Sequence, residues 1–128
     1  MKENILESMN VNDNITINYE KKKKIVIYVK NTPIIMLPGS TKPKVLISLS
    51  LYNKLLKNLI KWSENDYNTK FLDYKIAFPL LKELRRVGET RFQIIFQQEI
   101  LKEYATRGLR VKEFLKNEGY LKLIGDFF

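Results

Sequence analysis

The chain has 128 residues and is strongly basic: 23 lysines and arginines stand against 14 aspartates and glutamates, which gives a formal net charge of +9. An excess of this size attracts polyanions and releases their counterions on binding, so nucleic acid is the leading class of partner. The chain has no cysteine and no histidine, which excludes thiolate nucleophiles, disulfides, imidazole bases and the usual zinc ligand sets. We expect one small domain that is not an enzyme and uses no cofactor, metal or small-molecule substrate.

Neither a membrane segment nor a targeting segment is expected. No stretch approaches the roughly 20 consecutive apolar residues that a spanning helix needs. The first residues, MKENILESMNVND, have neither the apolar core of a secretory signal nor the arginine-rich pattern of an organelle presequence. The protein is therefore expected to act in the compartment where it is made.

The N-terminal part of the chain alternates apolar and polar residues. The segments ITINY (15–19) and KIVIYVK (24–30) flank a charged connection and predict a β-hairpin. After the turn at Pro38 and Gly39, KVLISLS (44–50) is expected to form another strand.

A helix is the firmest expectation of the middle part. In LYNKLLKNLIKW (51–62) the leucines and the tryptophan share one face and the lysines the opposite face, and Ser50 is expected to cap this helix. A turn-rich segment follows at 63–69. Pro79 is expected in the first turn of a helix, PLLKELRR (79–86), because proline suits that position.

The C-terminal part is less regular. Arg91–Phe96 has the β-branched and aromatic content of a strand, whereas 97–104 is ambiguous between helix and strand. VKEFLKNE (111–118) predicts a helix that Gly119 ends, and YLKLI (120–124) predicts a closing strand. The expected fold class is α+β, with a small mixed or antiparallel sheet and short helices.

The basic turn Thr106-Arg107-Gly108, followed by Arg110 and Lys112, is the main candidate for function. Glycine permits positive φ and close backbone approach, threonine offers a hydroxyl donor, and the next helix presents free N–H groups to an anion. The turn therefore predicts a phosphate or ribose clamp. The alternative is an ordinary chain reversal whose cations are solvated.

Thr41, Lys42, Pro43 and Lys44 form a second basic turn. Because proline presets φ, the turn would be rigid, and its two cations could contact a nucleic-acid backbone at the edge of the following strand. The alternative is a solubilising lysine pair, and the run Lys21–Lys24 is interpreted as a solvated hairpin tip.

Several segments, taken in order, carry a family resemblance: KKKKIVIYVKN, PIIMLPGSTKPKVLIS, LYNKLLKNL and ATRGLRVKEFLKNEGYLKLIGDFF. Together they resemble the C-terminal half of the bacterial-type ribosomal small-subunit protein eight family. The resemblance implies an rRNA-binding structural component of the small ribosomal subunit that docks on the central domain of the small-subunit rRNA and supports assembly and translation. Thr106, Arg107 and Gly108 would be the main RNA contact, and Lys42 and Pro43 would support it.

The same resemblance implies a domain division. Residues 1–40 would be the remnant of a first lobe, reduced to a β-hairpin, and residues 41–128 the RNA-binding lobe, with an inserted segment at about 60–92. That insertion is rich in aromatic residues and is expected to dock on a neighbouring ribosomal protein. Such a shortened and expanded form would suit a mitochondrial ribosome and a protein encoded in the organelle, with a cytoplasmic location as the alternative.

Two other functions remain open. A winged-helix DNA-binding protein would use 100–119 as helix, turn and helix and 120–128 as a wing strand. A non-enzymatic interaction module would carry its basic charge incidentally. The segment Gln97–Tyr104 discriminates between the first two, because a strand there favours the ribosomal protein and a helix packed on 111–115 favours the DNA-binding protein.

Overall fold

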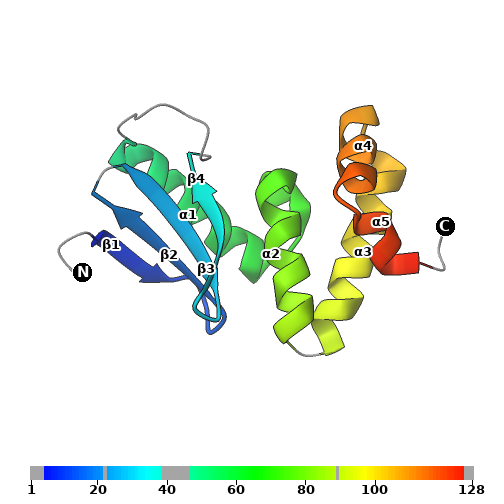
Figure 1. Cartoon of the computed structure of the whole chain (residues 1–128), viewed down its shortest axis with the longest axis horizontal. Helices are drawn as coiled ribbons and strands as arrows, with labels where there is room; N and C mark the ends of the chain where they lie inside the picture. The colour runs from blue at the N-terminus through cyan, green and yellow to red at the C-terminus, as the bar shows by residue number, and fades with distance from the viewer. Residues whose placement is uncertain (1–4, 22, 39–46, 89, 126–128) are drawn as a thin grey trace.

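The computed structural model describes residues 5–21, 23–38, 47–88 and 90–125. They form an α+β fold in which one antiparallel sheet of four strands is followed by five α-helices (Figure 1). The strands are β1 (Ile5–Asn10), β2 (Ile15–Glu20), β3 (Lys24–Val29) and β4 (Thr32–Leu37). They pair in chain order, so the expected α+β class is confirmed.

The sheet buries mainly one face, as the alternating sequence predicts, although the paired residues Asn18 and Val26 on the other face are also buried. Ile15 pairs with Val29 and Ile17 with Ile27, and all four side chains are fully buried because residues two apart along a strand point to the same side. The expected hairpin of β2 and β3 is therefore confirmed. A two-residue turn joins β3 to β4, in which Lys30 and Asn31 have φ of 50° and 72°, as tight hairpins require.

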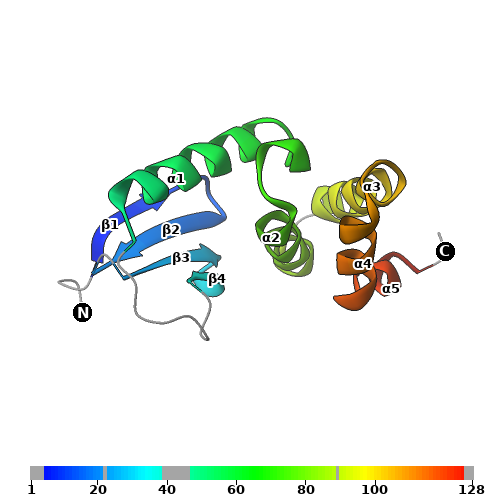
Figure 2. The ribbon, with the colours of Figure 1, turned by 90° about the horizontal axis from the view of Figure 1, so that it is seen from above.

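Helix α1 (Leu49–Glu64) covers the buried face of the sheet (Figure 2). Its apolar side inserts Tyr52, Leu55, Leu59 and Trp62, and Tyr52 stacks on Tyr19 of β2 with ring centroids 5.2 Å apart. The helix was expected, but its start was wrong.

The cap of α1 is Ser48, whose side chain accepts a hydrogen bond from the Leu51 N–H at 3.1 Å, and not Ser50. Ile47 and Ser48 are not in a strand, and Leu49 already belongs to the helix. The expected strand at 44–50 is thus wrong over its described part, and its first residues, 44–46, lie outside the described chain.

Helix α2 (Tyr74–Val87) lies between the sheet and helix α3 (Thr90–Thr106), as Figure 2 shows. It begins before Pro79, since the Asp73 side chain caps it by accepting from the Lys75 N–H at 2.9 Å. The strand expected at Arg91–Phe96 is wrong, because these residues form the first turns of α3. Phe92, Phe96 and Ile100 are buried at a spacing of four residues, which is the period of a helix.

Gly88 makes the corner between α2 and α3 possible. A Cβ atom at this position would lie 2.5 Å from the Leu84 carbonyl oxygen and 2.6 Å from Cδ2 of Phe92. Any larger residue would force the two helices apart, so the close packing of this corner depends on glycine.

The chain ends in two short helices, α4 (Leu109–Asn117) and α5 (Tyr120–Ile124). Gly119 separates them with φ of 78°, so this glycine does stop α4 as expected. The closing strand expected at 120–124 is wrong, because those residues are helical. Tyr120 packs its ring against Phe78, Phe96 and Phe114, which ties α5 to α2, α3 and α4.

The aromatic residues of the expected insertion belong to the protein's own core. Trp62, Tyr67, Phe78 and Phe92 are at most 3% exposed, and Tyr67 meets Trp62 and Phe92 edge to face. These four rings are therefore not available as a docking surface. Docking of 60–92 on another protein would have to use other residues of this segment.

Candidate nucleic-acid interface

Thr106 and Arg107 lie where α3 ends and the chain turns into α4. The Thr106 hydroxyl donates to the Lys102 carbonyl oxygen at 2.7 Å, one turn earlier in the same helix. Its proton is therefore already used, and only the oxygen lone pairs remain for a ligand. The expectation that this hydroxyl would donate to a nucleic acid does not fit the structure.

Gly108 plays a simpler part than the sequence suggests. Its φ is −77°, a value open to any residue, and a Cβ atom there would meet nothing within 4 Å. The positive φ that glycine permits is not used here, and no described residue approaches Gly108 closely. Gly108 is the N-cap of α4 and offers no side-chain cap.

The two cations that follow differ in their surroundings. Arg110 is exposed in the first turn of α4. Lys112 is half-buried, with Nζ 5.4 Å from the centre of the Tyr104 ring. Leu109, between Gly108 and Arg110, is 70% exposed.

The second basic turn, Thr41, Lys42, Pro43 and Lys44, lies outside the described residues. At the hairpin tip, Lys21, Lys23 and Lys24 are exposed, and Lys24 pairs with Glu20 at 3.7 Å. Long, exposed pairs of this kind contribute little to stability. The solvated tip is a sufficient description of these lysines.

The structure places Arg107 in a cleft that the sequence did not reveal. The cleft has a volume of about 400 Å³ and lies between α1, the 3-10 helix η2 (Thr69–Phe71) and the end of α3. Its walls are mainly polar and carry three cations. The lining residues are Asn58, Lys61, Thr69, Lys70, Phe71, Leu72, Asp73 and Arg107.

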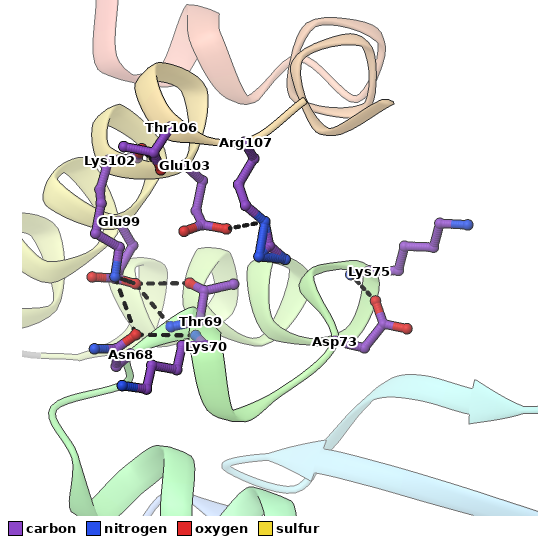
Figure 3. A network of polar contacts seen from close by, with 10 residues as sticks. All are labelled: Asn68, Thr69, Lys70, Asp73, Lys75, Glu99, Lys102, Glu103, Thr106 and Arg107. Carbon is purple, nitrogen blue, oxygen red and sulfur yellow. Dashed lines mark hydrogen bonds and ion pairs between the residues drawn. The ribbon is translucent and has the colours of Figure 1, made fainter. Parts of the chain in front are cut away.

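A partly buried carboxylate of α3 holds Thr69, one of the residues that line this cleft. Glu99 of α3 accepts hydrogen bonds from the N–H and the hydroxyl of Thr69 at 2.9 and 2.8 Å, and it pairs with Lys102 at 2.9 Å. Lys102 in turn donates to the Asn68 side chain at 3.1 Å. Figure 3 shows this network joining α3 to the segment that leads into α2.

Arg107 reaches into the cleft beside a second carboxylate. Its Nε lies 3.3 Å from Oε1 of Glu103, which is one turn back on α3 and only 4% exposed. Figure 3 shows the guanidinium extending past Glu103 toward the segment that holds Thr69 and Asp73. Lys70 lines the same cleft, but its ammonium end turns away from Arg107.

A row of lysines extends the positive charge from the cleft along α1. Lys54, Lys57 and Lys61 are spaced by three and four residues, and all are exposed on the side opposite the buried face. None of them forms an ion pair with another described residue. This row, together with Lys70 and Arg107, is called the α1 basic face below.

The α1 basic face can attract an anion without first breaking ion pairs, except at Arg107. Uncompensated lysines on an exposed helix are suited to contact phosphate groups, which need charge and not a fixed geometry. Among the described residues no cluster of acidic side chains could hold a metal ion, and no described helix is long and apolar enough to cross a membrane.

Sequence reasoning found Arg107 but missed its partners. The lysines of α1 were recognised only as the polar face of a helix, and nothing marked Asn58, Thr69 or Asp73. The spacing of the three lysines, with no acidic residue between them, is the signal that could have found the row.

Comparison with known proteins gave no match: no family model matches the chain, and neither a curated protein nor a solved structure does so significantly.

Proposed function

We propose that this protein binds nucleic acid by contacting phosphate groups with the α1 basic face, and that the nucleic acid is structured RNA. The observation that carries the proposal is the row of unpaired lysines on α1, which leads into a cleft that also holds Arg107. A net charge of +9 adds long-range attraction and makes the binding sensitive to salt.

The more specific proposal is a structural role in the small ribosomal subunit, on its rRNA, in a mitochondrion. Its support is the basic charge and the Thr-Arg-Gly turn, which resembles that of ribosomal small-subunit protein eight. The helices at 97–104 and 120–124 weigh against it, since the family is expected to have strands in both places. Neighbouring ribosomal proteins would then be its other partners.

A second candidate, DNA binding, is favoured by the helical state of Gln97–Tyr104. These residues belong to α3, which turns at Arg107 and Gly108 and packs against α4. Two helices joined by a short turn could place α4 in a major groove. Over its described part the expected wing strand does not form, because 120–124 is helical.

Salt-dependent binding measurements test the proposal. We expect the protein to bind an RNA stem–loop with a log–log slope of roughly −4, which corresponds to about five phosphate contacts. A slope near zero would remove nucleic-acid binding altogether. Equal or tighter binding to duplex DNA of matched length would favour the second candidate.

Sedimentation of the protein with small ribosomal subunits tests the more specific role. Association that persists at raised salt would support it, because weak non-specific contacts dissociate as salt rises. Release of the protein together with other weakly bound basic proteins would count against it, even if the RNA stem–loop binds.

A further inference from the structure

We propose that the cleft between α1, η2 and the end of α3 is a site for one phosphodiester group, and that buried Glu103 positions Arg107 to hold it. This proposal deepens the proposed function and rests on it. It assigns a binding role to Glu103. Surface charge alone would not suggest this role, because a carboxylate repels a nearby phosphate.

The first observation concerns the nitrogen atoms of Arg107. The atom paired with Glu103 is Nε, at 3.3 Å, and no hydrogen bond joins Nη1 or Nη2 to any described residue. The two Nη groups form the fork that binds two oxygens of a phosphate at once. The contact with Glu103 therefore occupies the side of the guanidinium and leaves its fork available.

The second observation is the burial of Glu103. Its side chain is 6% exposed, and Oε1 accepts no hydrogen bond from any described residue. A buried carboxylate oxygen without a hydrogen bond is costly, and removing the ion pair that compensates the charge costs more. The contact with Glu103 therefore restricts the rotamers of the Arg107 side chain, which is 42% exposed, before a ligand arrives.

The third observation is that the opposite walls of the cleft suit a phosphate. Lys61 of α1 and the side-chain amide of Asn58 line the cleft, and neither forms an ion pair or hydrogen bond through its side chain with another described residue. A phosphodiester in the cleft would thus meet the Arg107 fork on one side and the unpaired Lys61 ammonium group on another. Asp73 in the same cleft limits the net attraction.

Two variants that remove the same negative charge separate positioning from simple electrostatics. Both Glu103→Gln and Asp73→Asn delete one carboxylate near Arg107. If charge alone mattered, both would strengthen binding to an RNA stem–loop. Asparagine is as good an N-cap as aspartate, so Asp73→Asn keeps α2 intact and should strengthen binding about two- to fivefold. We expect Glu103→Gln instead to weaken it about tenfold.

Arg107→Lys supplies the control for the fork. Lysine keeps the charge but has no fork, so we expect about tenfold weaker binding. In that background Glu103→Gln should have little further effect, because there is no guanidinium to position. Thermal unfolding of each variant checks that the fold is retained.

Occupation of the cleft can also be measured directly, with a small phosphodiester in place of the stem–loop. Titration of a dinucleoside monophosphate should shift the Nε–H and Nη–H nuclear magnetic resonance signals of Arg107, and the shift should be lost in Glu103→Gln. Binding of the stem–loop that is unchanged or strengthened in Glu103→Gln would overturn the positioning role while leaving the proposed function standing. Absence of any stem–loop binding by the unmodified protein would instead overturn the proposed function. An unshifted Arg107 signal would overturn the phosphate site itself.

Discussion

Replacing the lysine row of α1 tests where nucleic acid binds. The triple variant Lys54→Gln, Lys57→Gln, Lys61→Gln removes three positive charges from the exposed side of one helix. Glutamine is nearly as good a helix former as lysine. Because the buried side of α1 is untouched, the free energy of unfolding should change by less than about 0.5 kcal/mol for each substitution.

The magnitude follows from the number of lysines. Each phosphate contact contributes about 0.7 to 0.9 to the slope of log K against log salt concentration, so three lost contacts should reduce the slope by about 2 to 3. A slope of roughly −4 would fall to between about −1 and −2. Fluorescence anisotropy of a labelled RNA stem–loop at several potassium chloride concentrations measures it.

A matched control removes the same charge elsewhere. The variant Lys21→Gln, Lys23→Gln, Lys24→Gln alters the exposed hairpin tip, which lies at the end of β2 and the start of β3. If α1 is the interface, this control should change the slope by less than about 1. Equal changes in both variants would mean that only net charge matters, and an unchanged slope in the α1 variant would refute an interface on this helix.

Three further predictions concern stability and titration. Gly119→Ala should cost about 1 kcal/mol or more, because Gly119 has φ of 78°. Gly108→Ala should change the free energy of unfolding by less than about 0.5 kcal/mol in a chemical denaturation experiment, since Gly108 has φ of −77° and open space, and the loss of a glycine N-cap is offset by the smaller entropy of the unfolded chain. Thr69→Val should cost about 1 to 3 kcal/mol in the same experiment, because it removes one of the hydrogen bonds to Glu99; a change below about 0.5 kcal/mol would show that this anchor is dispensable. Burial, with a smaller effect of the Glu118 charge, raises the pKa of Tyr120 from 10.0 to about 12. The folded state therefore keeps this proton longer than the unfolded chain does, so stability should be independent of this group below pH 10 and fall between pH 10 and 12; phenolate absorbance should show one tyrosine that titrates last, unless Tyr120 is accessible to water.

The sequence predicted those elements whose periodicity is strong. The alternation in β2 and β3 requires every second side chain to be buried, which only a strand allows. The two-sided pattern of α1 requires side chains three and four residues apart to be buried together, which only a helix allows. The predictions of strands at 91–96 and 120–124 were wrong. They relied on the preference of β-branched and aromatic residues for strands, which is a local tendency. In the fold those residues fill helix–helix contacts, and tertiary packing overrides such preferences.

The candidate site was only partly predictable for a different reason. Arg107 stood out because its neighbours in the chain are basic. The cleft, however, forms from α1, η2 and α3, and the hydrogen bonds that link η2 to α3 join Thr69 and Glu99 across 30 positions of sequence. A carboxylate such as Glu103 looks like an ordinary surface residue of a helix until its burial is known. Contacts of this kind depend on the packing of α2 against α3, which no local pattern encodes.

The position of α2 makes the sheet and the C-terminal helices depend on each other. This helix contacts β3 and β4 on one side and α3 on another, and its Phe78 meets Tyr120 of α5. A fragment that ended at Gly88 would still contain all four strands, but its Phe78 side chain would be exposed to water. Proteolytic nicking or truncation within α3 to α5 should therefore not release a stable N-terminal fragment, and both halves should melt in a single transition.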